Sequence, residues 1–342
     1  MDVDLLKLVK QAIKKHNKKS VSTFLNIAPG TLGRWLDLES VPKQYVFDLL
    51  KLCDIPIDYS KFNSTEKDQF FTPIKTAEHC FNIFKTIIEK YGDDYKSYRY
   101  IEPSAGSGNF LNVLPDDTIA LDIEPKGDNI ILQDYLEYYP PTDIKYIVFG
   151  NPPFGLRGQL ALKFINHSAK FADYTCFILP QLFESDGKGV PRKRVNGYNL
   201  IHSEKLNSNF ESPDNKVVKV QCIFQIWSKY HTNEEYDIIS NDDNIKVYSI
   251  TNGNTPSSTR NKHMINKCDV YIPSTCFGKE NFKPYFNFYD LPNERGYGLV
   301  FTKNKNEYLN KVKKIDWSND VAFLSTNSAY NTRTSSIIKA LK

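Results

Sequence analysis

The sequence lacks any apolar run close to the roughly 20 residues that a membrane-spanning helix requires. Its first residues, MDVDLLKLVKQ, also lack the apolar core of a secretory signal peptide. We therefore expect a cytoplasmic protein that is not secreted and has no membrane partner.

Disulfide and metal-binding patterns are missing as well. The six cysteines are scattered through the chain, without a C-x-x-C pair or a histidine at zinc spacing. We expect reduced thiols and no bound metal. There is also no serine–histidine–aspartate pattern and no histidine cluster, so neither a hydrolytic triad nor a metal centre is expected.

Neither sign of charge is in strong excess. The chain has 342 residues and a formal net charge of +4, which permits a polyanionic partner without requiring one. With 40% apolar and 25% charged residues, the composition is that of an ordinary globular protein. The length predicts two or three domains.

Residues 1–58 are predicted to form a small helical domain. Polar residues that favour helix starts stand before several short amphipathic runs. The expected helices are Asp4–His16, a short one capped by Ser20 that runs to Leu25, Thr31–Leu38 and Tyr45–Cys53.

Within this domain, the stretch SVSTFLNIAPGTLGRWL resembles the helix-turn-helix of phage-repressor-type DNA-binding domains. The resemblance makes the segment from Thr31 to Leu36 the recognition helix, with Trp35 and Leu36 on its core face. Thr31 and Arg34 are then candidates for DNA contact. A helical bundle that only packs on the next domain is the alternative, because a shared fold does not fix a function.

After a polar linker, residues 66–235 alternate between strand-like and helical runs, which predicts a parallel α/β sheet. Residues 240–342 form a third region, rich in asparagine, serine, threonine and lysine, with short strand-like pieces and one helix. The expected strands of the sheet are Tyr100–Glu102, Thr118–Asp122, Ile130–Leu132, Tyr146–Gly150, Tyr174–Leu179 and Val217–Trp227; those of the third region are Lys246–Ile250, Val270–Ile272 and Tyr297–Phe301, with the helix at Lys305–Lys314.

The most informative segment is Val148-Phe149-Gly150-Asn151-Pro152-Pro153-Phe154. Two prolines cannot continue a central strand, so the chain leaves the sheet at its carboxyl edge, where open α/β sheets bind ligands. Asn151 and the Pro152 carbonyl can accept hydrogen bonds from an exocyclic amine, and Phe154 can stack on a base. These residue types suit methylation of the adenine N6 amine, which is a poor nucleophile until its lone pair is localised.

A second motif lies upstream, in the sequence Glu102-Pro103-Ser104-Ala105-Gly106-Ser107-Gly108. It joins a strand to a helix start through two glycines, without the third glycine of the dinucleotide fingerprint, which argues against NAD and FAD. Twenty residues after Glu102, Asp122 ends the next strand, where an acid can hold ribose hydroxyls. Asp134 ends a third strand and can accept a hydrogen bond from an adenine amine.

Together with Phe70-Phe71-Thr72-Pro73, this order of motifs resembles the gamma-arrangement N6-adenine DNA methyltransferases of restriction–modification systems. The resemblance covers about half of the chain. It implies a Rossmann-like methyltransferase sheet, S-adenosyl-L-methionine as cofactor, double-stranded DNA as partner, a target-recognition region at 240–342, and a cognate restriction endonuclease as a further partner to look for. It leaves the oligomeric state open.

Carried over by matching positions, the resemblance also assigns site residues. Phe224 is the candidate aromatic for the flipped base, and a basic loop after the strand ending near Pro180 is a candidate for phosphate contact. The implied catalytic residues are Asn151, Pro152, Pro153 and Phe154; the implied cofactor residues are Thr72, Pro73, Glu102, Ala105, Gly106, Asp122, Ile123, Asp134, Tyr135 and Asn151; the basic loop contributes Lys188, Arg192, Lys193 and Arg194.

Other functions stay open at this level. Methylation of adenine in RNA, of cytosine N4 or of a glutamine side chain uses related pockets, although Phe154 argues against glutamine and Asn151 against cytosine. A DNA-binding regulator with a silent methyltransferase fold is a different class, and the intact motifs argue against it.

Overall fold

The computed structural model describes residues 3–25, 27–63, 67, 69–185, 190–206, 209–211, 217–219, 221–236, 242–253, 259–289, 291–292, 294–324 and 329–342. The chain divides into two compact units, Met1–Phe70 and Phe71–Lys342. The division falls later than residue 58, and residues 240–342 belong to the same unit as the sheet. In the described part, no helix is both long and apolar enough to span a membrane.

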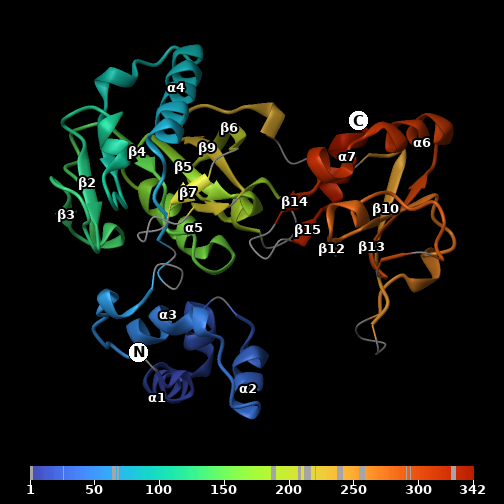
Figure 1. Cartoon of the computed structure of the whole chain (residues 1–342), viewed down its shortest axis with the longest axis horizontal. Coiled ribbons are helices and arrows are strands. Elements are labelled where there is room, and N and C mark those ends of the chain that lie inside the picture. The colour runs from blue at the N-terminus through green and yellow to red at the C-terminus, as the bar shows by residue number, and fades with distance from the viewer. Residues whose placement is uncertain are drawn as a thin grey trace. The chain divides into compact units, whose positions relative to one another are not determined.

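The first unit consists of α1 (Leu5–Phe24), α2 (Pro29–Asp37) and α3 (Val46–Leu52), shown in blue in Figure 1. Asn17 has φ 64° and ψ 160°, so it breaks α1 into two helical stretches. The Asn17 side chain accepts a hydrogen bond from the Ser20 N–H at 3.0 Å. The expected capping role of Ser20 is therefore wrong, and Asn17 provides the cap.

Helix α2 begins at Pro29, a favourable first residue because its missing N–H would have no helical partner. Its buried side chains are Leu32 and Trp35, while Leu36 is half-buried. The expectation that Trp35 and Leu36 form the core face is thus right for Trp35 only. Leu32, and not Leu36, shares the buried face with Trp35, because residues three positions apart lie on the same side of a helix.

The second unit is built on a seven-stranded sheet in the order β3-β2-β1-β4-β5-β9-β6. Neighbours from β3 to β5 are parallel, and β9 is antiparallel to both β5 and β6. The expected α/β fold class, a Rossmann-like sheet, is confirmed. The strands are β1 (Arg99–Glu102), β2 (Ile119–Asp122), β3 (Ile131–Leu132), β4 (Tyr146–Gly150), β5 (Tyr174–Pro180), β6 (Asn199–Leu206) and β9 (Cys222–Ser228).

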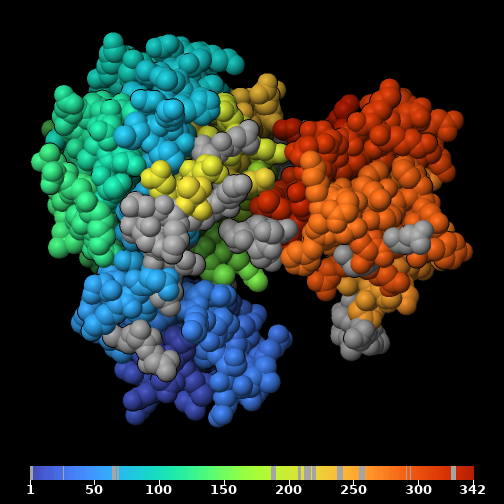
Figure 2. All heavy atoms as spheres, viewed as in Figure 1, coloured from blue at the N-terminus to red at the C-terminus, as the bar shows by residue number. Residues whose placement is uncertain are grey.

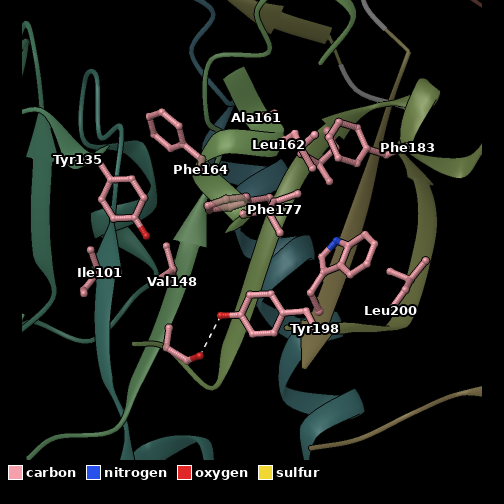
Figure 3. Close-up of a cluster of buried hydrophobic side chains, with 14 of the residues drawn as sticks. Ile101, Tyr135, Val148, Ala161, Leu162, Phe164, Phe177, Phe183, Tyr198 and Leu200 are labelled. Carbon is pink, nitrogen blue, oxygen red and sulfur yellow. Dashed lines mark hydrogen bonds between the residues drawn. The ribbon is translucent and has the colours of Figure 1, made fainter. Parts of the chain in front are cut away.

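Alternation along the strands gives the sheet two apolar faces. On one face, Phe84 of α4 (Ile74–Lys90) packs its ring edge-on against Phe149 of β4. On the other, α5 (Gln159–Ser168) packs on a cluster that includes Val148 and Phe177. Figure 3 shows this second cluster, with Tyr135 lying among the same side chains. Both faces are closed by helices, which suits a mainly parallel sheet.

The expected strand Val217–Trp227 is two strands. Its first part, β8 (Val217–Lys219), pairs with β7 (Asn209–Glu211) in a separate hairpin, and its second part is β9 in the main sheet. The hairpin is tied to the start of the unit through main-chain bonds between Phe71 and Glu211. In Figure 2 the yellow residues of this hairpin lie beside the cyan residues that lead into α4.

Beyond the sheet, the chain forms two small antiparallel sheets, β10-β13-β11 and β12-β15-β14, with a common apolar cluster around Trp317 and Leu299. The Leu324 N–H donates a hydrogen bond at 2.9 Å to the side chain of Gln181, which directly follows β5 of the main sheet. The elements are β10 (Ile245–Thr251), β11 (Val270–Pro273), β12 (Thr275–Phe277), β13 (Arg295–Phe301), α6 (Lys305–Lys314), β14 (Phe323–Leu324), β15 (Ala329–Asn331) and α7 (Thr334–Leu341).

Phe224 of β9 is a core residue. Its side chain is fully buried, and its ring centroid lies 5.6 Å from that of Phe149. A fully buried ring has no open face for a base, so the expected base-stacking role of Phe224 is not retained.

We expect Phe224→Ala to lower the free energy of unfolding by about 3–5 kcal/mol, the cost of removing a buried phenylalanine. Denaturant unfolding of the full chain measures this change. A variant with unaltered stability but reduced activity would instead restore Phe224 as a functional aromatic.

Candidate functional site

The Glu102–Gly108 motif and the Asn-Pro-Pro-Phe motif meet at the point where the chain order of the sheet reverses. From β1 the chain moves outward to β2 and β3, and it returns to β4 on the other side of β1. Ligands of open α/β sheets bind at the carboxyl ends of strands at this switch point. Glu102 ends β1 and Gly150 ends β4, so the two motifs lie on neighbouring strands at the same edge.

The glycine turn after β1 passes close to its neighbours. Gly106 has φ 54°, and the Phe71 ring lies 3.1 Å from the position that a Cβ at residue 106 would occupy. Gly108 also has positive φ, at 80°. Other residues would strain both the backbone and this contact. Ala105 is buried, and its N–H donates to the Leu121 carbonyl at 2.9 Å, which ties the turn to β2.

Glu102 is an acid in an unusual position. It is 1% exposed, and its Oε2 has no hydrogen-bond partner among the described residues. Burial, reinforced by the negative charge of Asp122, raises the pKa of Glu102 well above its usual range. A buried, unpartnered carboxyl beside a second carboxylate fits a cationic ligand group, such as the ammonium and sulfonium of S-adenosyl-L-methionine.

Asp122 is buried at the end of β2 and is stabilised by main-chain donors. Its two carboxylate oxygens accept hydrogen bonds from the Gly106 and Glu124 N–H groups, both at 2.7 Å. Each oxygen keeps capacity for a further donor, such as a ribose hydroxyl. The next residue, Ile123, is 42% exposed although it is apolar, so it offers a surface for a flat ring.

The third strand end is only partly as expected. Asp134 is half-buried, and its carboxylate accepts a hydrogen bond from the Leu136 N–H at 2.9 Å. Tyr135 is 1% exposed, with its hydroxyl 2.6 Å from the Ser168 Oγ and its ring against Phe164. The expectation that Tyr135 lines the cofactor site is therefore wrong, because it points into the core beneath the sheet.

The Asn-Pro-Pro-Phe turn projects from β4 and then returns to α5. Asn151, Pro153 and Phe154 are half-buried, and Pro152 is buried. The Phe154 carbonyl accepts hydrogen bonds from the Leu160 and Ala161 N–H groups at 3.1 and 3.2 Å, which holds the turn on the start of α5.

Gly155 makes this return possible. It has φ 65°, and a Cβ at residue 155 would stand 2.7 Å from the Leu160 Cβ. A larger residue would therefore displace the turn from α5, and with it the Phe154 ring.

Thr72 lies beside Asn151. Thr72 is 4% exposed, and its Oγ1 accepts a hydrogen bond from the Asn151 Nδ2 at 3.2 Å. Pro73 precedes α4, where its carbonyl accepts from the Thr76 and Ala77 N–H groups. Both residues were expected at the methionine end of a cofactor, and the structure places the Thr72 side chain against Asn151 of the Asn-Pro-Pro-Phe turn.

Two residues, one in the quoted glycine motif and one directly after it, were not assigned a role from sequence. The Ser104 Oγ donates to the main-chain carbonyl of Asn151 at 3.1 Å. The Asn109 Nδ2 donates to the main-chain carbonyl of Thr72 at 2.8 Å. The available signal was that polar side chains stand in the glycine turn and directly after it.

The basic loop differs from expectation. The Arg192 guanidinium donates to the main-chain carbonyls of Tyr236 and Glu184, and the Arg194 guanidinium bonds the Gln159 side chain at 3.0 Å. These side chains fasten the loop to the fold, so phosphate contact by Arg192 and Arg194 is not supported. Lys193 is exposed, and Lys188 lies outside the described residues.

In the helical unit, Arg34 is exposed and Thr31 is half-buried on α2. The Lys18 Nζ lies 3.3 Å from the position that a Cβ at Gly33 would occupy, so a second cation stands over α2. Arg34 and Lys18 thus place two cations at the surface of α2, which also carries the exposed Asp37; cations are the groups that contact phosphates.

No protein-family model matches the sequence, and no curated protein matches it significantly. Several solved structures are similar. The type IIL restriction–modification enzyme MmeI in complex with DNA has 10% identity and a TM-score of 0.44, with 84% of this chain and 72% of that chain covered. A proposed RNA methyltransferase from Pyrococcus horikoshii has 17% identity and a TM-score of 0.37, with 49% and 91% covered.

The 23S rRNA methyltransferase ErmE has 12% identity and a TM-score of 0.28, with 43% of this chain and 68% of that chain covered. Identities and scores this low support no conclusion about activity. The fold assignment therefore depends on the strand order and directions described above.

The raised pKa of Glu102 predicts a pH dependence of stability. Since the folded pKa exceeds the ordinary 4.5, the folded protein retains a proton that the unfolded chain releases, and stability falls as pH rises from 4.5 through the raised pKa. We expect Glu102→Gln to flatten this fall and to gain stability relative to wild type at neutral pH. Denaturant unfolding of the cofactor-free chain across this range measures it; identical pH profiles for both proteins would contradict the assignment.

Proposed function

We propose that this chain is a site-specific DNA methyltransferase that transfers a methyl group from S-adenosyl-L-methionine to the N6 amine of a flipped-out adenine. The observation that carries the proposal is the Asn-Pro-Pro-Phe turn at the end of β4, bonded through Ser104 to the glycine turn at the end of β1. The turn proposed to accept the substrate amine thus lies beside the glycine turn proposed to accept the cationic cofactor.

The residues at the sheet edge fit the cofactor by chemistry. Glu102 would hold the cationic methionine end, Asp122 the ribose hydroxyls, and Ile123 one face of the adenine ring. Gly106 would let the main chain approach closely, and Asp134 would accept from the adenine amine. When bound, the cofactor supplies an electrophilic methyl group on a sulfonium.

The catalytic turn would prepare the nucleophile. The Asn151 Oδ1 and the Pro152 carbonyl oxygen accept the two N6 hydrogens, which localises the lone pair and aims it at the methyl group. Phe154, half-buried and fixed by its carbonyl bonds to α5, stacks on the flipped base. Pro153 limits the backbone freedom of the turn.

Double-stranded DNA is the proposed partner. The helical unit carries Arg34 and Lys18 on or over α2, and residues 240–342 are proposed to read the target sequence. A flipped adenine needs both a base pocket and phosphate contacts that hold the distorted duplex.

The central test compares two variants. We expect Asn151→Ala to abolish methyl transfer to duplex DNA with little change in cofactor affinity, because Asn151 faces the base. Asp122→Ala should weaken cofactor binding by about 10- to 150-fold, equivalent to about 1.5–3 kcal/mol. Calorimetric titration and radioactive methyl transfer measure the two effects, with the exposed Asn82→Ala as control.

Mass spectrometry of the product nucleosides identifies the substrate. N6-methyldeoxyadenosine from duplex DNA supports the proposal. Label found in cytosine, or in RNA of the same sequence but not in DNA, would overturn it.

A further prediction concerns α2. We expect Arg34→Ala to weaken duplex binding and to reduce the salt dependence of log K by about 0.9 per lost phosphate contact. Titration at several salt concentrations measures this slope, with Lys7→Ala, an exposed cation on α1, as the matched control. Unchanged affinity at every salt concentration would remove α2 from the DNA interface.

A further inference from the structure

The side chain of Asn151 is oriented by a residue from the start of the unit. The Asn151 Nδ2 donates to the Thr72 Oγ1 at 3.2 Å. An amide presents a donor on one arm and an acceptor on the other, so a bond that engages Nδ2 directs the Oδ1 elsewhere. For a substrate amine this matters, because only the oxygen can accept its hydrogens.

Thr72 is itself firmly held. Its carbonyl accepts from the Asn109 Nδ2 at 2.8 Å. The preceding residue, Phe71, exchanges main-chain hydrogen bonds with Glu211 at 2.6 and 3.0 Å, and its ring packs on Gly106. Because Thr72 is also buried, its hydroxyl has a defined position relative to the turn after β4.

The main chain of Asn151 is fixed from a second direction. The Ser104 Oγ donates to the Asn151 carbonyl oxygen at 3.1 Å. Segment 71–73 therefore holds the side chain of Asn151, and segment 102–109 holds its backbone. With the backbone held, the hydrogen bond to the Thr72 hydroxyl acts on the rotation of the side-chain amide.

We propose that Thr72 is a positioning residue whose hydroxyl orients the Asn151 amide with its oxygen toward the substrate, and so selects an exocyclic amine as the group that is methylated. This inference rests on the proposed function for its chemistry. It also changes the role of Thr72, which the sequence placed against the methionine end of the cofactor.

The two roles make different predictions. If the hydroxyl orients Asn151, Thr72→Val lowers kcat by about 10- to 100-fold, as a misplaced catalytic group does, with cofactor affinity nearly unchanged. If the hydroxyl binds the cofactor, the same variant raises the cofactor Kd. Thr72→Ser keeps the hydroxyl and should restore kcat. Thr86→Val, the same change on the exposed face of α4, is the matched control.

A second measurement does not depend on activity. With selective 15N-asparagine labelling, the Asn151 side-chain amide is identified by its absence from Asn151→Ala. In wild type and Thr72→Ser the amide protons should exchange slowly with water, and in Thr72→Val they should exchange faster. Thr72→Ala repeats the test if Thr72→Val does not fold.

The proposal is supported if the Asn151 side-chain amide protons exchange slowly only when residue 72 has a hydroxyl, and if Thr72→Val lowers kcat while the cofactor Kd stays constant. An Asn151 amide signal unaffected by Thr72→Val, or a loss confined to cofactor Kd, overturns it. If wild type methylates no nucleic acid, the proposed function fails, and the amide exchange still decides whether Thr72 orients Asn151.

Discussion

The close packing of Gly150 against the end of β1 is the contact on which the site depends. A Cβ at residue 150 would stand 3.4 Å from the Glu102 Cγ and 3.3 Å from the Pro103 Cδ, tighter than most side chains tolerate. The absence of a side chain avoids this crowding where the paired strands β1 and β4 end. Just beyond these ends, Ser104 in one turn reaches the main chain of Asn151 in the other. Two chemically different turns are thereby hydrogen-bonded to each other.

The same edge places two acids in unequal surroundings. Main-chain donors stabilise the charge of Asp122, whereas Glu102 is buried without a described partner for its Oε2. Burial, and then the neighbouring charge of Asp122, raises the pKa of Glu102, so this carboxyl favours its proton. A cation bound at this edge would favour the ionised form of Glu102 and would thereby link ligand binding to the stability of the fold.

The aromatic face under α4 supplies the rigidity that this arrangement needs. Phe149 packs against Phe84, Phe110 and Phe224, and it directly precedes Gly150. Turns that carry reactive groups keep their geometry when they extend from such a rigid base. Substitutions in this core are thus expected to act on the site through the position of the β4 end.

The sequence alone determined β4 and the turn after it, because an apolar run that ends in glycine and proline is a local signal, and β4 was predicted to the residue. Helix α6 was also predicted to the residue. It missed β6, whose polar sequence NLIHSEKL suits an edge strand. Only tertiary structure decided that Tyr135 and Phe224 are core residues and that Arg192 bonds the distant Tyr236 carbonyl. Burial and pairing depend on residues far apart in the chain, which no local pattern encodes.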